Sequence, residues 1–377
     1  MRHFGQTITK IIDKMSTNKP NRVVFLDWLR IFAFASVLIG HKFYANLVTI
    51  SNDDSIHATL RFIVKALLPW VTYGVAGVVV FFLISGYIVI HVLQSTQPSD
   101  FLIKRIFRIY PLYLFAVLIH YSVIVYAQPI RIPLKILIPQ LLLIGDFFHT
   151  PHTLNGIEWT LRIEILFYLY MFFMSYCKLT SQYKFALPWI FLVTVVLIGN
   201  LPTFPNQLWN AGYFNIYSPF LFLGAMFWLY ENRTIGLTFL GMFAAVVFLQ
   251  HWHLVAVLTP GLRTAHFSFL AAGLFLLVWA FRKQFIFNKT AFFFSELTYA
   301  VYLTHNWFFD YVKMGLDSIK VAHSSRYALL ALLLFSAALV RLIEKPGIKL
   351  GQKLLNQLKN YRFRPSFKTS PYLEGQA

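Results

Sequence analysis

The chain has 377 residues, of which 58% are hydrophobic and only 12% are charged, and its formal net charge is +19. Apolar runs of about 17 to 25 residues recur along it, as membrane-spanning helices require. A soluble core could not use so much apolar surface, and a transmembrane β-barrel would instead show alternating segments of about 10 residues. We therefore predict an all-α fold, a polytopic transmembrane helical bundle.

Ten apolar ranges are each predicted to form a membrane-spanning helix. In chain order they are Val23 to Tyr44, Pro69 to Leu93, Ile109 to Ala127, Trp159 to Tyr176, Phe185 to Leu201, Tyr213 to Tyr230, Ile235 to Gln250, His266 to Phe281, Ala291 to Phe309 and Tyr327 to Leu342.

The range from Ile132 to Phe148 is also apolar, but it carries two prolines, Lys135 and Asp146. An eleventh crossing would invert everything downstream and place Arg282 and the basic C-terminal tail outside, against the positive-inside rule. We therefore interpret this range as a re-entrant or interfacial segment on the outer side.

The positive charge follows from this topology, because most Lys and Arg residues lie at the predicted cytoplasmic membrane edges. The predicted organisation is a cytoplasmic basic segment (1–22), a transmembrane domain (23–345) and a cytoplasmic basic tail (346–377), in the cytoplasmic (inner) membrane. The basic edges favour contact with membrane lipids, and we expect no nucleic acid partner. The single cysteine, Cys177, excludes an intrachain disulfide and a multi-cysteine metal site, and no metal is expected.

The first apolar range carries Asp27, Arg30 and His41, where a simple membrane anchor would carry no polar group. A charged side chain near the bilayer centre costs about 2.5 to 3.5 kcal/mol by insertion scales. Eleven residues at about 100° each return His41 to within about 20° of the Arg30 face, about 16 Å farther along the axis. Asp27 can pair with Arg30 on that face. A lone intramembrane histidine is as often part of a polar seam between helices, but three such residues together favour a site.

Five segments of the chain carry polar residues among apolar ones. Two of them, Phe25-Leu-Asp-Trp-Leu-Arg30 with His41 and Phe81-Phe-Leu-Ile-Ser-Gly-Tyr87, resemble the first two helices of the membrane-bound acyltransferase 3 family. Lys104-Arg-Ile-Phe-Arg-Ile-Tyr-Pro111, Trp159-Thr-Leu-Arg-Ile-Glu164 and Leu297-Thr-Tyr-Ala-Val-Tyr-Leu-Thr-His305 are similar to its later motifs, in family order. Thr160 stands where the family usually has Ser, and Arg162 is an unusual charge. We expect Glu158 to pair with Arg162, four residues on.

The resemblance implies an O-acyltransferase that moves an acyl group, acetyl by family default, from cytoplasmic acyl-CoA to a hydroxyl. The acceptor would be a cell-envelope glycan, a lipid-linked carbohydrate or a similar molecule. Many family members carry an appended soluble transferase domain, and its absence here implies either a complete reaction or transfer to a separate soluble transferase partner.

The residues that match the motifs fit this chemistry. His41 is the expected general base, because the pKa of an unperturbed histidine, about 6.5, suits proton transfer near neutrality. Glu164 has no cation three or four residues away, and we expect His41 or Arg30 to pair with it. The predicted catalytic residues are His41, Glu164 and Asp27.

The donor site is expected on the basic motifs. Arginine pairs with phosphate bidentately, and Ser85 is a candidate hydrogen-bond donor to the oxyanion formed in the reaction. The predicted donor-binding residues are Arg30, Arg105, Arg108 and Ser85, with a possible additional site at His305, Tyr302 and Trp159.

Each assignment has a structural alternative. Arg105 and Arg108 could be positive-inside anchors, Glu164 a structural ion pair, and His305 a satisfied structural histidine. The pair of Ser85 and Gly86 is more typical of a close helix contact than of a site, because small residues let backbones approach. A secondary transporter of a polar or lipid-linked substrate would also need intramembrane charge, but the chain lacks the paired broken helices of two repeated halves. A noncatalytic membrane scaffold would tolerate neutralising these charges.

Overall fold

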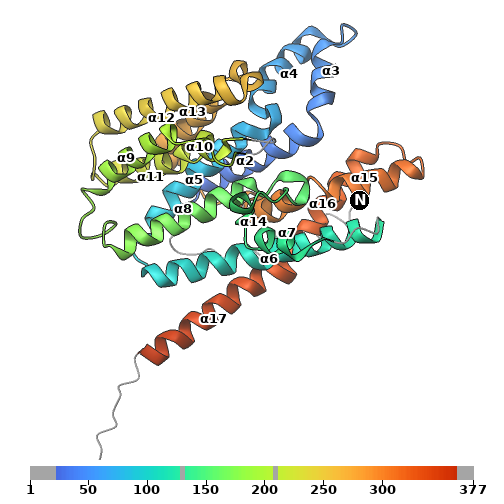
Figure 1. Ribbon diagram of the computed structural model, residues 1–377. Helices are drawn as coiled ribbons and strands as arrows, with labels where there is room; N and C mark the ends of the chain where they lie inside the picture. Colours follow the sequence, from blue (N-terminus) through green and yellow to red (C-terminus); the bar gives the residue numbers. More distant parts are fainter. Residues whose placement is uncertain (1–22, 128–131, 207–210, 363–377) are drawn as a thin grey trace, which may run out of the picture.

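The computed structural model describes residues 23–127, 132–206 and 211–362, and in these ranges the chain is helical with no β-strand (Figure 1). The prediction of an all-helical fold is confirmed. Residues 1–22 and 363–377, with the predicted basic N-terminal segment and part of the basic tail, lie outside the described residues. The α-helices are α2 (Phe25–Lys42), α3 (Tyr44–Asn52), α4 (Ala58–Val71), α5 (Val75–Leu93), α6 (Pro98–Ala127), α7 (Leu134–Leu141), α8 (Trp159–Tyr176), α9 (Leu187–Asn200), α10 (Tyr213–Tyr217), α11 (Pro219–Glu231), α12 (Leu237–Leu258), α13 (Phe267–Ala280), α14 (Lys289–Thr304), α15 (Phe308–Ser318), α16 (Ser324–Leu339) and α17 (Lys345–Arg362).

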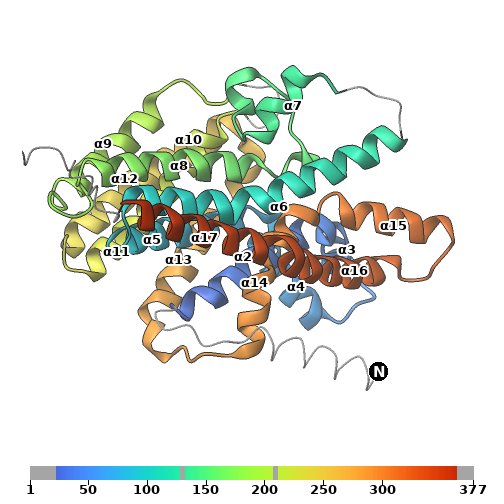
Figure 2. The same cartoon turned by 90° about the horizontal axis from the view of Figure 1, so that it is seen from below.

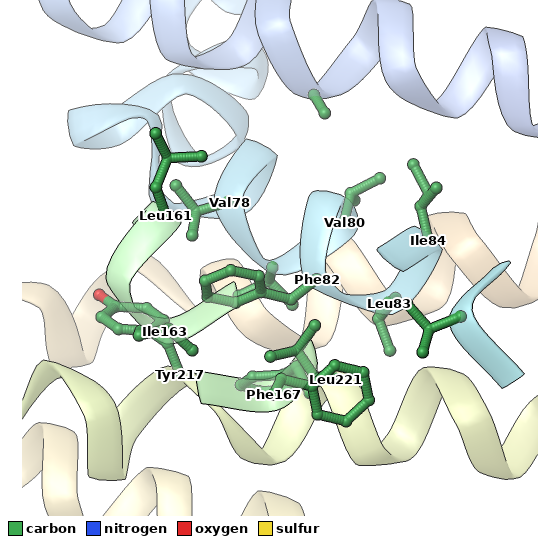
Figure 3. Packing of buried hydrophobic residues seen from close by; sticks show 14 of the residues in the cluster. Val78, Val80, Phe82, Leu83, Ile84, Leu161, Ile163, Phe167, Tyr217 and Leu221 are labelled. Carbon is green, nitrogen blue, oxygen red and sulfur yellow. The ribbon is translucent and has the colours of Figure 1, made fainter. Parts of the chain in front are cut away.

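Helix α5 is the centre of the packing. It is apolar on nearly every side, and a helix of that kind is stable only when neighbours cover it all round. It packs against α2, α8, α11 and α13. Figure 3 shows Phe82 and Leu83 of α5 gathered with Phe167 of α8 and Leu221 of α11.

Helices α5 and α11 cross at two glycines. A Cβ atom added at Gly86 would lie 1.8 Å from the carbonyl oxygen of Leu221, and one at Gly224 would lie 2.1 Å from that of Leu83. Only glycine lets the two backbones approach this closely. The interpretation of Gly86 as a close helix contact is confirmed.

Helix α17 continues α16 through a π-helical turn, Val340–Glu344, and lies along α6 (Figure 2). Gly347 and Gly351, four residues apart on α17, face Pro111 and Phe107 of α6. The small-xxx-small spacing brings the two helices into contact. This pairing holds the basic end of α6 against the C-terminal helix.

Helices occupy all ten of the predicted ranges, but ten membrane crossings are not confirmed. Among the described residues, four helices are long and apolar enough to cross a membrane, or five if the bent pair of α2 and α3 counts as one span. Several of the others, such as α9 and α13 with 14 residues each, are shorter than the roughly 20 residues of a typical span.

The range from Ile132 to Phe148 forms only short helical pieces. Helix α7 has eight residues and is followed by the 3₁₀ turns η2 (Gly145–Phe148) and η3 (Leu154–Gly156). At 1.5 Å per residue α7 is about 12 Å long, against a hydrocarbon core of about 30 Å. A single-helix crossing by this segment is therefore excluded.

Candidate active site

One face of α2 runs along two adjoining cavities. Arg30, Ala33, Phe34 and Val37 line a cavity of about 290 Å³, here called the Arg30 cavity. Val37, Gly40, His41 and Tyr44 line a second cavity of about 880 Å³, the His41 cavity. Residues spaced by three and four share one face of a helix. The structure thus places Arg30 and His41 on the same side of α2, each in its own cavity.

The Arg30 cavity is rich in guanidinium groups. Arg30 from α2 and Arg105 and Arg108 from α6 line it. Helix α8 adds the carboxylate of Glu164 and the hydroxyl of Tyr168. The Arg105 guanidinium lies 5.1 Å from the centre of the Tyr168 ring, a cation–π contact that orients it. Asp27, behind the cavity, pairs with Arg30, so Arg105 and Arg108 supply the positive charge that suits this cavity to an anionic ligand.

Glu164 is held within this cavity by two hydroxyl groups. Ser85 Oγ donates to Glu164 Oε1 across 2.6 Å, and the Tyr168 hydroxyl donates to the same oxygen. The expectation was a pairing of Glu164 with His41 or Arg30; the hydrogen bonds of Glu164 Oε1 come instead from these two hydroxyls, and His41 Nδ1 bonds to His305. Ser85 lines the cavity, but its proton is engaged by Glu164, so its expected role as an oxyanion donor is not supported by this geometry.

Asp27 stands behind Arg30 and is not among the residues that line either cavity. Its Oδ1 accepts a hydrogen bond from Arg30 Nη1 at 3.1 Å, as the three-residue spacing predicted, and another from Ser295 Oγ of α14 at 2.7 Å. Asp27 is only 2% exposed. It therefore fixes Arg30 and ties α2 to α14, and touches no cavity itself.

The two histidines of the motifs meet. His41 Nδ1 lies 2.9 Å from His305 Nε2, and His305 Nδ1 lies 2.7 Å from the carbonyl oxygen of Tyr302. A carbonyl only accepts, so His305 Nδ1 carries a proton and donates it. In the neutral ring Nε2 is then an acceptor, and His41 Nδ1 must be the donor to it.

This hydrogen-bond chain leaves His41 Nε2 without a proton. His305 is fully buried, whereas His41 is exposed to its cavity. A neutral imidazole with a bare Nε2 is the form that accepts a proton. His305 does not line either cavity, and its place in the chain is to select the tautomer of His41.

The wall of the His41 cavity combines aromatic rings and amides. Trp159 lies between Tyr213 and Tyr217, with ring centres 5.2 Å and 5.1 Å away. Asn155 and Asn306 exchange hydrogen bonds, each amide donating to the other residue's backbone carbonyl at 3.3 Å and 2.9 Å. Aromatic faces and amides are groups that bind polyhydroxylated ligands.

Arg162 is buried and holds this wall in place. Its Nη2 donates to Glu158 at 3.1 Å, so the expected pair is confirmed, and its Nη1 donates to Asp146 at 2.5 Å. The Tyr213 hydroxyl donates to the other oxygen of Asp146. Arg162 therefore connects the segment around η2 to α8 and, through Asp146, to the cavity residue Tyr213.

Several of these residues were missed from the sequence. Tyr168 follows Glu164 by four residues, so the helical spacing could have predicted the hydrogen bond between the two side chains. Asn155, Asn306 and Tyr213 carry no local signal, because they come from distant segments that only the fold brings to one cavity.

The chain matches a known protein family over most of its length. The model of the acyltransferase 3 family, described as an acyltransferase domain, matches residues 23–343, which is most of the chain. No curated protein and no solved structure matches it. The matched range contains the lining residues of both cavities.

Proposed function

The chain belongs to the acyltransferase 3 family and is a membrane acyltransferase, and we propose that it carries an acyl group, acetyl by family default, from acyl-CoA to a carbohydrate hydroxyl. The observation that carries the proposal is the pair of adjoining cavities along α2, one with three arginines and one with His41. A donor and an acceptor can meet at their boundary without sharing one site.

The Arg30 cavity is the proposed donor site. Arginine is the side chain best suited to phosphate, because its planar fork makes two charge-assisted hydrogen bonds at once. A cavity of about 290 Å³ suits the narrow acyl-bearing arm of the donor, with the nucleotide phosphates near Arg105 and the exposed Arg108. Glu164 can accept a hydrogen bond from an amide N–H of that arm.

The donor cavity is proposed to open to the cytoplasm. The basic motif around Arg105 lies at the start of α6, and the positive-inside rule places such a cluster on the cytoplasmic side. Both termini would then be cytoplasmic, the protein would sit in the inner membrane, and the His41 cavity would face outward.

His41 is the proposed general base. Its Nε2 accepts the proton of the acceptor hydroxyl while the oxygen attacks the thioester carbonyl carbon. As the carbon–sulfur bond breaks, the thiolate leaves and takes the proton back from His41 Nε2, which gives an ester and a free thiol with no net change in protons.

The acceptor is proposed to be a glycan or lipid-linked sugar in the His41 cavity. The rings of Trp159, Tyr213 and Tyr217 offer flat apolar faces to the C–H face of a sugar. Asn155 and Asn306 lie where their amides can exchange hydrogen bonds with hydroxyls. Lys42, the neighbouring cation, is neutralised by both carboxylate oxygens of Asp310 at 2.8 Å, so the cavity favours a neutral acceptor.

The test is a histidine substitution with a matched control. His41→Gln removes the base, and His253→Gln changes an exposed histidine of α12 outside both cavities. Each variant is expressed in cells that lack the chain, and the cell-envelope carbohydrate is examined by mass spectrometry for a difference of one acyl unit. Acetyl-CoA binding to the purified protein is measured alongside.

We expect His41→Gln to bind acetyl-CoA normally and to modify nothing, while His253→Gln behaves like the wild type. Unchanged modification by His41→Gln would reject His41 as the base. Failure of the wild-type protein to bind acetyl-CoA would reject the acyltransferase proposal for this donor.

A further inference from the structure

Three residues line both cavities and so form the boundary between them. They are Val37 of α2, Val78 of α5 and Tyr302 of α14. Two of the three are small apolar side chains, only 5% and 7% exposed. Any group that passes from the Arg30 cavity to His41 has to fit between these side chains.

The spacing between the two valines is fixed by backbone contact. A Cβ atom added at Gly77 would lie 2.3 Å from the carbonyl oxygen of Ala33, and one at Gly74 would lie 2.7 Å from the Cα atom of Val37. Helices α2 and α5 therefore touch through their main chains just beside the boundary. The distance between the two helices at the boundary is therefore set by main-chain contact and not by the size of side chains between them.

A hydrogen bond strengthens the same contact. Ser36, next to Val37, donates its hydroxyl proton to the Trp70 carbonyl at 2.6 Å and accepts from the Gly77 backbone N–H at 3.1 Å. The contact thus holds Val37 and Val78 in register. Sliding α2 along α5 would break the bond to Gly77, and the bond to Trp70 ties the same serine to α4.

Tyr302 closes the third side and is equally fixed. Its hydroxyl donates to the Ile157 carbonyl at 2.6 Å and lies 2.7 Å from Thr160 Oγ1. Its backbone carbonyl accepts from His305. The tyrosine that borders the opening is therefore tied to the histidine pair that would act on the acyl group.

We propose that Val37 and Val78 determine the length of acyl chain that the protein accepts. This rests on the proposed function, because the thioester carbonyl must reach His41 while its tail remains among the residues of the boundary. Two valines held by touching backbones leave room for a short tail. A longer tail would have to displace Val37, Val78 or the bonded Tyr302.

The test measures dissociation constants of acetyl-, butyryl- and hexanoyl-CoA for the purified full-length protein in detergent, so that no acceptor is needed. The variants are Val37→Ala and Val78→Ala, which enlarge the boundary, and Val37→Ile, which narrows it. The matched control is Val79→Ala, a valine of α5 that is fully buried and lines neither cavity.

We expect the wild type to prefer acetyl-CoA. One methylene in an apolar pocket alters discrimination by about 10- to 200-fold. Each alanine variant should therefore improve the affinity for hexanoyl-CoA, relative to that for acetyl-CoA, by about tenfold or more. Val37→Ile should bind butyryl-CoA more weakly than the wild type does, and Val79→Ala should keep the wild-type preference.

Three results would overturn the proposal: a wild type that binds hexanoyl-CoA as tightly as acetyl-CoA, alanine variants with the wild-type preference, or a Val79→Ala variant that shifts the preference equally. In each of these cases the wild type still binds acetyl-CoA, and the acyltransferase proposal stands. Absence of all acyl-CoA binding by the wild type would instead overturn both proposals.

Discussion

His41 donates its Nδ1 proton to His305 Nε2 across 2.9 Å, although 264 residues separate the two in the chain. The bond joins the end of α2 to the end of α14. Because the Tyr302 carbonyl fixes the proton of His305, the tautomer of a histidine in one motif is set by the backbone of another.

Substitution of His305 should slow the reaction without weakening donor binding. In His305→Ala the proton of His41 is free to move to Nε2, which removes the base, and we expect a fall in kcat of about 100-fold or more. His305→Gln offers a carbonyl oxygen to His41 Nδ1 and should retain more activity. The measurements are kcat, its acid limb against pH, and the dissociation constant for acetyl-CoA.

A purely structural role for His305 would give a different pattern. The Ala and Gln variants would then lose folded protein together, and the remaining protein would keep the wild-type kcat and pH profile. Size-exclusion chromatography in detergent supplies the amount of folded protein for that comparison.

Alanine at Gly86 should disrupt the crossing of α5 and α11. The added Cβ would lie 1.8 Å from the Leu221 carbonyl oxygen, and overpacking of this kind costs about 1 to 3 kcal/mol or more. Gly241→Ala on α12 is the matched control, because a Cβ there meets nothing within 4 Å. Thermal unfolding in detergent should show a large loss for the first and none for the second. Equal stabilities would contradict the close crossing.

Arg162→Met should destabilise the protein through the carboxylates that it leaves behind. Removing one partner of a buried ion pair costs about 3 to 5 kcal/mol, and here both Asp146 and Glu158 would lose their cation. Combining Arg162→Met with Asp146→Asn and Glu158→Gln should recover much of the stability. Thermal unfolding of the two variants makes the comparison, and no recovery in the triple variant would count against the charge argument.

Neutralising the arginines of α6 should weaken the binding of the acyl donor and reduce the effect of salt on that binding. A hydrogen bond to a charged group contributes about 1.5 to 3 kcal/mol, so Arg105→Gln or Arg108→Gln should raise the dissociation constant for acetyl-CoA about tenfold or more. Arg233→Gln, at an exposed turn and in neither cavity, is the control. Titration calorimetry at two salt concentrations tests both effects. Equal affinities for all three variants would leave Arg105 and Arg108 as membrane-edge anchors.

The all-helical fold class and the shared face of Arg30 and His41 on α2 were predictable, because both depend on local periodicity. Arg30 and His41 share a face wherever the helix runs unbroken, and α2 does so from Phe25 to Lys42. The same reasoning gave the contacts of Asp27 with Arg30 and of Glu158 with Arg162. Short spacings on one helix fix such pairs before any tertiary packing.

The number of crossings was less predictable. Hydropathy finds apolar helices but does not separate a helix that spans the membrane from a shorter one that packs inside the bundle. Helix α9, with 14 residues, passes for a span by composition only. Length and surroundings come from the packing of neighbouring helices, which the sequence does not display.

What the sequence alone determined was an all-helical membrane protein with its polar motifs in order along the chain, because apolar length and helical period are local properties. The tertiary structure decided which distant side chains form hydrogen bonds: His41 with His305, Glu164 with Ser85, and Arg162 with Asp146. It also decided that Val37 and Val78 stand between two cavities. Such contacts join residues far apart in the chain, and only the packing of helices through their small residues sets which side chains come within hydrogen-bonding distance.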